Sequence, residues 1–264
     1  MLRTKHLLMD KASIILIIIM LLLRYPLLFM SQFGLINNTV SMVAFLLGTY
    51  LCTGIFICKN IKSLYQYCIS TPALILFLLS PIASFICNSN DPTALVRIAM
   101  AIVFVIYLFR KRHILSVKND KKTILPNCLI VIACIVLTTL LFAYLRGFSG
   151  VESPFTLTML ANSLLFQLSF AAVMEEPLFR GFLWGGFQQL GLSEGWICIL
   201  QALLFWLGHI YYFNTEINFW VIIPIGSLVL GFIIMKTKSI AYSMVTHSFM
   251  NSLGDIFQHF IKLF

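Results

Sequence analysis

Six side chains inside long apolar stretches of the last third of the chain are of the types that activate water. They are two carboxylates, a guanidinium, two imidazoles and a carboxamide: Glu175, Glu176, Arg180, His209, His247 and Asn251. Ionisable groups in hydrocarbon are costly, so they persist where they are paired, hydrated or used. A carboxylate or a neutral imidazole can take a proton from water, and an amide or imidazole N–H can donate to an oxyanion. The set therefore indicates addition of water to an amide carbonyl.

The spacing of these residues predicts shared helical faces. Three pairs lie four positions apart, and so one turn apart on a helix: Glu176 and Arg180, Phe205 and His209, His247 and Asn251. The first pair has the acid first, which favours an ion pair within one helix. Pro177 removes a backbone donor and predicts a distortion directly after the carboxylates.

Other hydrolase and metal patterns are absent from the sequence. There is no HExxH segment and no GxSxG segment, so neither a zincin nor a serine hydrolase of that type is predicted. The seven cysteines form no CxxC pair and lie mostly in apolar runs, so we expect neither a disulfide framework nor a zinc–cysteine site.

The composition indicates the elements that must position these groups. Of the 264 residues, 60% are hydrophobic and 10% charged, whereas a soluble domain has about 45–50% apolar and about 25% charged residues. Apolar runs of helix-spanning length recur, which predicts an all-α, polytopic transmembrane bundle. We expect nine spans, with eight as the alternative because the third and fourth are short: 13–30, 39–58, 71–87, 93–109, 124–145, one from 154 through Glu175, 196–213, 219–235, and one from 240 onward.

The basic residues predict the orientation of the spans. With a cytoplasmic N-terminus, 13 of the 18 Lys and Arg residues fall in inside segments, and only Arg146 and Lys262 fall outside. This asymmetry favours the N-terminus inside, an odd number of spans and the C-terminus outside. The net charge of +9 then reflects topology and contact with the lipid bilayer, and we expect no nucleic-acid binding.

A basic linker from 110 to 122 divides the chain into two predicted parts. Residues 1–122 would hold the N-terminal spans and the linker, and residues 123–264 the chemical core. In the first part, Arg24 could snorkel or pair with a residue of another span, and Arg97 is expected to snorkel near the end of its helix. We interpret both as structural.

Depth along the helices predicts where the polar groups meet. With a rise of ~1.5 Å per residue, Glu175, His209 and Asn251 lie ~18–20 Å from the inner end of their spans, and His247 lies ~12 Å from it. Three helices of independently assigned direction thus bring polar groups to similar depths. We expect a cavity that opens to the inner face.

At these residues the sequence resembles the CAAX protease and bacteriocin-processing family of intramembrane proteases, also called CPBP or Abi. Three signatures occur intact and in order within 155–255: Glu-Glu-x-x-x-Arg at Glu175, Glu176 and Arg180, Phe-x-x-x-His at Phe205 and His209, and His-x-x-x-Asn at His247 and Asn251. Each signature alone is weak, but three in order, each in a predicted span, are specific.

The resemblance implies a cytoplasm-facing membrane peptidase that acts on a peptide or protein. It implies that Glu175 and His209 activate water, that His247 and Asn251 stabilise the oxyanion, and that Glu176 and Arg180 shape the site. Zinc is a possible cofactor in such enzymes, with Glu175, His209 and His247 as candidate ligands. By analogy, the chain would serve maturation of a pheromone or bacteriocin, or self-immunity, in a bacterial cytoplasmic membrane.

Two other functions remain open from the sequence. A non-proteolytic immunity or scaffold protein could keep the fold and use the site for binding alone. A small proton-coupled transporter could use buried glutamate and histidine as a relay. The chain shows no internal repeat of the kind that many transporters have, which disfavours the transporter.

Overall fold

The structure is a computed structural model that describes residues 9–88, 91–118, 123–146 and 156–260. Within them the chain forms nine helical segments, several of which contain π-helical turns, labelled η1, η4, η5 and η7. The segments are α1–η1–α2 (Lys11–Leu22, Leu23–Leu27, Leu28–Gln32), α3 (Asn38–Lys59), α4 (Thr71–Cys87), α5 (Ala94–Arg110), α6 (Ile124–Arg146), α7–η4–α8–η5–α9 (Leu157–Gln167, Leu168–Ala172, Val173–Glu176, Pro177–Leu183, Trp184–Gln189), α10 (Glu194–Leu207), η7–α11 (Asn218–Ile222, Ile223–Thr237) and α12 (Ile240–Phe260).

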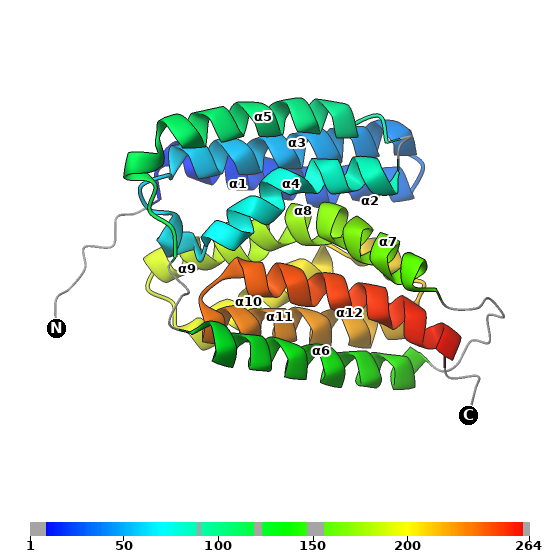
Figure 1. Ribbon diagram of the computed structural model, residues 1–264. Helices are drawn as coiled ribbons and strands as arrows, with labels where there is room; N and C mark the ends of the chain where they lie inside the picture. Colours follow the sequence, from blue (N-terminus) through cyan, green and yellow to red (C-terminus); the bar gives the residue numbers. More distant parts are fainter. Residues whose placement is uncertain (1–8, 89–90, 119–122, 147–155, 261–264) are drawn as a thin grey trace.

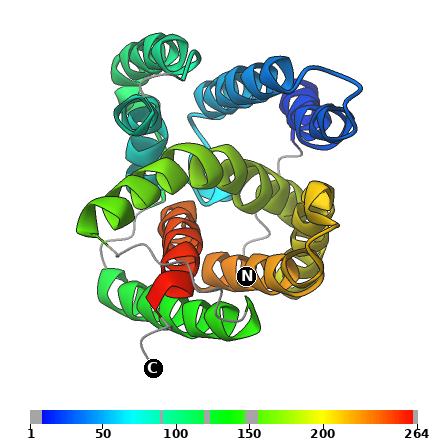
Figure 2. The same cartoon turned by 90° about the vertical axis from the view of Figure 1, so that its right-hand side faces the viewer.

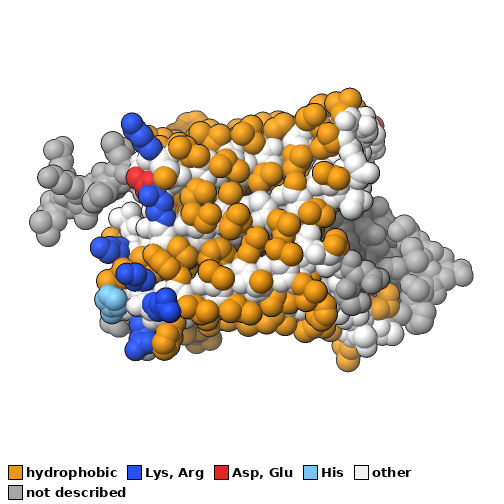
Figure 3. All heavy atoms as spheres, turned by 90° about the horizontal axis from the view of Figure 1, so that it is seen from above, with side chains coloured by type: hydrophobic (Ala, Val, Ile, Leu, Met, Phe, Trp, Pro, Cys, Tyr) orange, Lys and Arg blue, Asp and Glu red, His pale blue; other side chains and the backbone are white. Residues whose placement is uncertain are grey.

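These segments confirm the predicted all-α membrane bundle. Five of them are long and apolar enough to cross a membrane, and α4 and α10 are shorter apolar helices. Figure 3 shows a flank covered with hydrophobic side chains and a gathering of Lys and Arg at one end. Lys59, Arg110 and Lys236 lie in the last turns of α3, α5 and α11. The chain is therefore a multi-pass membrane protein, while the number of crossings and the side that faces the cytoplasm remain predictions.

The long segment from α7 to α9 runs through the middle of the bundle. Figures 1 and 2 show α1 to α5 on one side of it and α6, α10, α11 and α12 on the other. The first helix begins and the last helix ends at opposite ends of the bundle (Figure 1), and the odd number of spans stays a prediction. The predicted start of the sixth span near Pro154 lies outside the described residues.

Aromatic packing fixes the middle segment against the N-terminal helices. The ring of Phe182 in η5 stacks on Phe56 of α3, with 3.7 Å between ring centroids, and Tyr67 meets Phe56 edge-on at 4.9 Å. All three side chains are buried. Large buried aromatic pairs contribute area and a preferred geometry together, so this cluster sets the position of the helix two residues after Arg180.

Two of the π-helical turns, η1 and η5, contain a buried arginine. Arg24 lies in η1 together with Pro26, and Arg180 lies in η5, which begins at Pro177. A proline without an N–H cannot make the regular bond, and a π turn accommodates the extra residue without ending the helix. The distortion predicted at Pro177 is therefore present as a wide turn within a continuous helical segment.

Arg97 does not snorkel, so that prediction is wrong. Its side chain is 0% exposed, and Nη2 lies 2.5 Å from Oδ2 of Asp91 and 2.9 Å from Oγ of Ser84. Burial alone would raise the pKa of Asp91, but hydrogen bonds from Thr93 and Ser84 and the charge of Arg97 outweigh burial and lower it. The ion pair joins the loop before α5 to the helix itself.

Candidate active site

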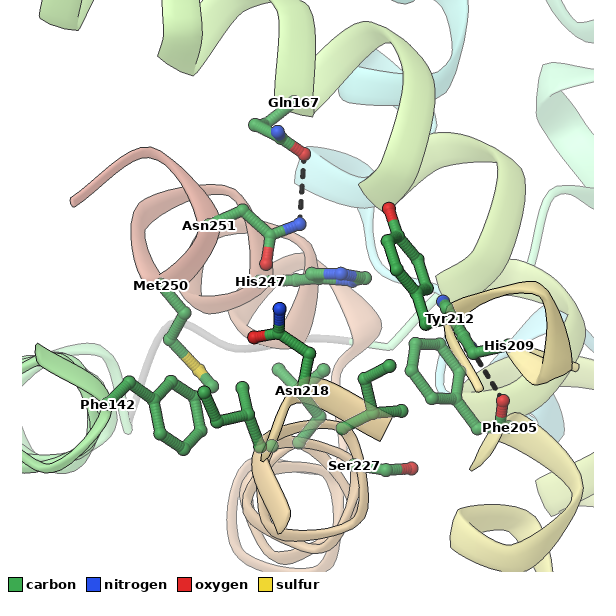
Figure 4. Close-up of a pocket in the computed structure, with 14 residues that line it drawn as sticks. Phe142, Gln167, Phe205, His209, Tyr212, Asn218, Ser227, His247, Met250 and Asn251 are labelled. Atoms are coloured by element: carbon green, nitrogen blue, oxygen red, sulfur yellow. Dashed lines mark hydrogen bonds between the residues drawn. The ribbon is translucent and has the colours of Figure 1, made fainter. Parts of the chain in front are cut away.

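The residues that the sequence singled out come together between the middle segment and the C-terminal helices. Glu175 and Glu176 end α8, Arg180 lies one turn later in η5, and the side chains of all three are buried. Figure 4 shows His209, His247 and Asn251 around one cavity, with the two histidines on opposite elements.

The second carboxylate, Glu176, joins three groups from two elements. Its Oε1 accepts a hydrogen bond from Nδ1 of His247 at 2.8 Å and lies 3.2 Å from Nη1 of Arg180, and its Oε2 accepts from the hydroxyl of Ser243. The predicted ion pair one turn apart is thus formed. Arg180 also donates to Oγ of Ser227 at 2.8 Å, so the carboxylate and its cation fasten the middle segment to both α11 and α12.

The first carboxylate, Glu175, is paired with a residue of the first helix. Nη1 of Arg24 lies 2.7 Å from Oε1 of Glu175, and Nη2 of Arg24 lies 2.8 Å from Nε2 of His209. Arg24 is 3% exposed. The sequence left two alternatives for Arg24, and the structure shows the pairing with another span rather than snorkelling.

The partners of the two histidines define their tautomers. A guanidinium only donates, so Nε2 of His209 accepts from Arg24, and its Nδ1–H donates to the carbonyl of Phe205 at 2.7 Å. In His247 the Nδ1–H donates to the Glu176 carboxylate, which leaves Nε2 facing Oε2 of Glu175 at 3.9 Å. That oxygen of Glu175 is buried and accepts no hydrogen bond from the described residues.

A cavity of about 420 Å³ adjoins these groups. Its polar lining comes from five elements: Gln167, His209, Tyr212, Asn218, Ser227, His247 and Asn251. Asn251 donates through Nδ2 to Oε1 of Gln167 at 2.9 Å (Figure 4). Because a carboxamide has two N–H groups, Asn251 keeps a second donor for another acceptor.

A comparison with protein families identifies the segment that contains this site. Residues 158–253 match the family model of the type II CAAX prenyl endopeptidase Rce1-like proteins. Residues 158–253 are an Rce1-like domain of the CPBP family. No curated protein and no solved structure was found to match the chain. The Rce1-like domain suggests a CAAX-type intramembrane protease, as the three signatures predicted.

One geometric expectation within the Rce1-like domain is wrong. His209 does not continue the helix of Phe205, because α10 ends at Leu207 and the backbone turns there, with N–H of His209 donating to the carbonyl of Trp206. That the cavity opens to the inner face stays a prediction; among the described residues its lining includes Gln167, Asn218 and His247.

Sequence reasoning missed several polar residues that complete the site. Gln167, Tyr212, Asn218 and Ser243 each line the cavity or bond to a signature residue. A signal was present for two of them, since Ser243 lies one turn before His247 and Gln167 is an isolated amide in an apolar stretch. Tyr212 belongs to the turn after α10 and Asn218 is the first residue of η7, and periodicity predicts no role for either.

The candidate zinc ligands do not fit a metal ion in this arrangement. Arg24 already bonds Oε1 of Glu175 and Nε2 of His209, which are atoms that a zinc ion would need. A fixed guanidinium beside a divalent cation would also be repulsive. Among the described residues, no group of three or more His, Cys, Asp or Glu side chains is arranged to hold a metal.

Proposed function

We propose that the chain is an intramembrane peptidase in which Glu175 takes a proton from the water that attacks a peptide carbonyl. One observation carries the proposal. Oε2 of Glu175 is buried, has no hydrogen-bond partner among the described residues, and lies 3.9 Å from Nε2 of His247. Buried acceptors of this kind are rare and call for a partner such as water.

A water molecule at this position would donate one hydrogen to Oε2 of Glu175 and the other to Nε2 of His247. Both of its hydrogens would then point at the protein, which leaves a lone pair of its oxygen to attack substrate in the adjoining cavity. Glu176 supports this arrangement because it accepts from Nδ1–H of His247 and so keeps Nε2 as the acceptor.

The reaction then follows from proton transfer between these groups. The water oxygen bonds to the carbonyl carbon while Glu175 takes one water proton, and the second N–H of Asn251 donates to the developing oxyanion. The carbon–nitrogen bond breaks as Glu175 returns its proton to the leaving amine, which yields a carboxylic acid and an amine. The resemblance gives the activating role of the imidazole to His209, but its Nε2 is bonded to Arg24, and the geometry favours His247.

The cavity supports a peptide substrate with apolar side chains near the cleaved bond. Besides the polar groups, its walls are aromatic and aliphatic: Phe142, Phe205, Ile222, Ile223, Leu230 and Met250. Its volume of about 420 Å³ is within the range of small-ligand sites, about 300–1,000 Å³. The resemblance favours maturation of a secreted peptide, or immunity to one, in a bacterial cytoplasmic membrane as the setting.

The test is cleavage of a defined set of hydrophobic peptides by the purified protein, read by mass spectrometry. We expect discrete products from the parent protein and none from Glu175→Gln or His247→Gln. His113→Gln serves as the matched control, because His113 is exposed in the short turn after α5. Equal cleavage by Glu175→Gln would refute the proposal.

The two rival functions give different results in the same preparations. A binding scaffold would retain its cellular phenotype in Glu175→Gln with unchanged membrane levels. A proton-coupled transporter would drive substrate uptake into liposomes under a pH gradient and leave every peptide intact.

A further inference from the structure

We propose that Arg24, which lies outside the Rce1-like domain, is a positioning residue of this peptidase site. The inference rests on the proposed function and adds a group from the first helix that none of the three signatures contains. Arg24 acts through Glu175 and His209 and does not touch the substrate.

Among the predicted site residues, Arg24 contacts Glu175 and His209 directly. Two different nitrogens of one guanidinium bond two different side chains, at 2.7 Å to Glu175 and 2.8 Å to His209. Neither Arg24 nor Glu175 belongs to the lining of the cavity beside His247. Arg24 instead lines a second hollow of about 400 Å³ between the first helix and the turn after α10. It therefore holds the pair from outside the substrate cavity.

The chemistry of the guanidinium explains why an arginine suits this position. Arginine stays charged in a protein and presents several N–H donors in a rigid fork, whereas lysine offers a single point charge. One arm balances the charge of Glu175 through Oε1, so that Oε2 remains the open oxygen. The other arm fixes the ring of His209 through Nε2. The position of the base is thus defined on the side away from water.

The surroundings of Arg24 hold the guanidinium in place. The hydroxyl of Tyr25 donates to the carbonyl of Leu204 and ties the first helix to α10. Gly208 leaves room beside Arg24, since a Cβ there would lie 3.4 Å from Nε of Arg24 and 3.3 Å from the Tyr25 ring. The π turn η1 includes Arg24 itself, and such turns are frequent at functional sites.

Kinetics of Arg24 variants test the positioning role. Arg24→Met keeps much of the side-chain length without the charge, and we expect kcat to fall about 10²-fold, the cost of a misplaced reacting group, with KM nearly unchanged. Arg24→Lys keeps the charge but lacks the two-armed fork of donors, so its kcat should lie between those of the parent protein and of Arg24→Met. Arg110→Met, the same substitution at an exposed residue in the last turn of α5, should cleave like the parent. An unchanged kcat in Arg24→Met would overturn the inference.

A second measurement does not depend on cleavage. The chain has five histidines, and nitrogen-15 labelling of histidine reports the state of each ring, with His209→Asn assigning the relevant signals. We expect the Nε2 signal of His209 to shift in Arg24→Met and to stay in place in Arg110→Met. An unshifted signal would overturn the inference even if the peptidase is active. A parent protein that cleaves no peptide would refute the proposed function alone, because the signal still reports the contact.

Discussion

Replacement of Glu176 by glutamine should destabilise the protein through the charge that it leaves behind. The substitution keeps size and shape: the amide oxygen of the new side chain can accept from His247 in the place of Oε1, and its amide N–H in the place of Oε2 can donate to the hydroxyl of Ser243. Arg180 is the group that loses its counter-charge: it is 0% exposed, it stays protonated, and among the described residues its hydrogen-bond acceptors, the hydroxyl and carbonyl of Ser227, are neutral.

The contacts of Arg180 indicate how much the free energy of unfolding should fall. Removal of one member of a buried ion pair costs about 3–5 kcal/mol. Because the hydroxyl and carbonyl of Ser227 face Nη2 of Arg180 and the ring of Phe205 lies 4.2 Å from its guanidinium carbon, we expect the lower end. A loss of about 3 kcal/mol corresponds to about a hundredfold change in the unfolding equilibrium constant.

The decisive comparison is the double variant Glu176→Gln with Arg180→Met. Replacement of both members of a buried pair by neutral groups of similar volume is often neutral or stabilising, so the double variant should unfold at a higher denaturant concentration than Glu176→Gln. Reversible unfolding in mixed micelles, followed by tryptophan fluorescence, to which the buried Trp184 contributes, measures the stability of both variants. If Arg180→Met lowers the free energy of unfolding further in the double variant, Glu176 does not stabilise the protein by balancing the charge of Arg180, and the reasoning fails.

Three further outcomes follow from the same structure. Ser243→Ala, which removes a hydroxyl donor to the Glu176 carboxylate, should lower the free energy of unfolding by about 1.5–3 kcal/mol, whereas Ser248→Ala, which breaks only a bond to a helical carbonyl, should have little effect; denaturant titration compares them. Asp91→Asn should destabilise the protein at neutral pH. Since the pKa of Asp91 is lowered from 3.8, its contribution is present above about pH 4 and lost as the pH falls through the lowered pKa, so the melting temperatures of parent and variant should converge in acid. A chelator should leave the cleavage rate unchanged, because Arg24 occupies the atoms that a metal would need, and loss of cleavage that zinc restores would contradict that reading.

The helices could be predicted from the sequence because apolar runs are a property of single stretches of chain. Each predicted span has a helical counterpart, although the seventh ends at Leu207, well before the predicted 213. The signature residues could be predicted for a similar reason, since helical spacing relates residues that are close in sequence. The division into residues 1–122 and 123–264 remains a prediction.

What escaped prediction depends on which helices lie against each other. Arg24 meets His209 across 185 positions, and its own span gives no sign of that neighbour. No partner for Arg97 was predicted from the sequence, whereas in the structure Asp91 of the loop before α5 forms an ion pair with it. Tyr212 of the turn after α10 and Asn218 at the start of η7 line the cavity, and the depth of the signature residues along their helices gives no sign of either.

The ion pair between Arg24 and Glu175 has a consequence for biosynthesis of the protein. Its two members are 151 residues apart in the numbering of the chain, and at about 5–20 residues per second the ribosome needs roughly 8–30 s to bridge them. An arginine in the middle of a span opposes insertion by about 2.5–3.5 kcal/mol. The first helix therefore enters the membrane while its cation has no counter-ion, and it is held meanwhile by its aliphatic residues and by contacts with α3. Arrival of the middle segment then completes the pair, so that a late step of assembly is also a step that forms the site.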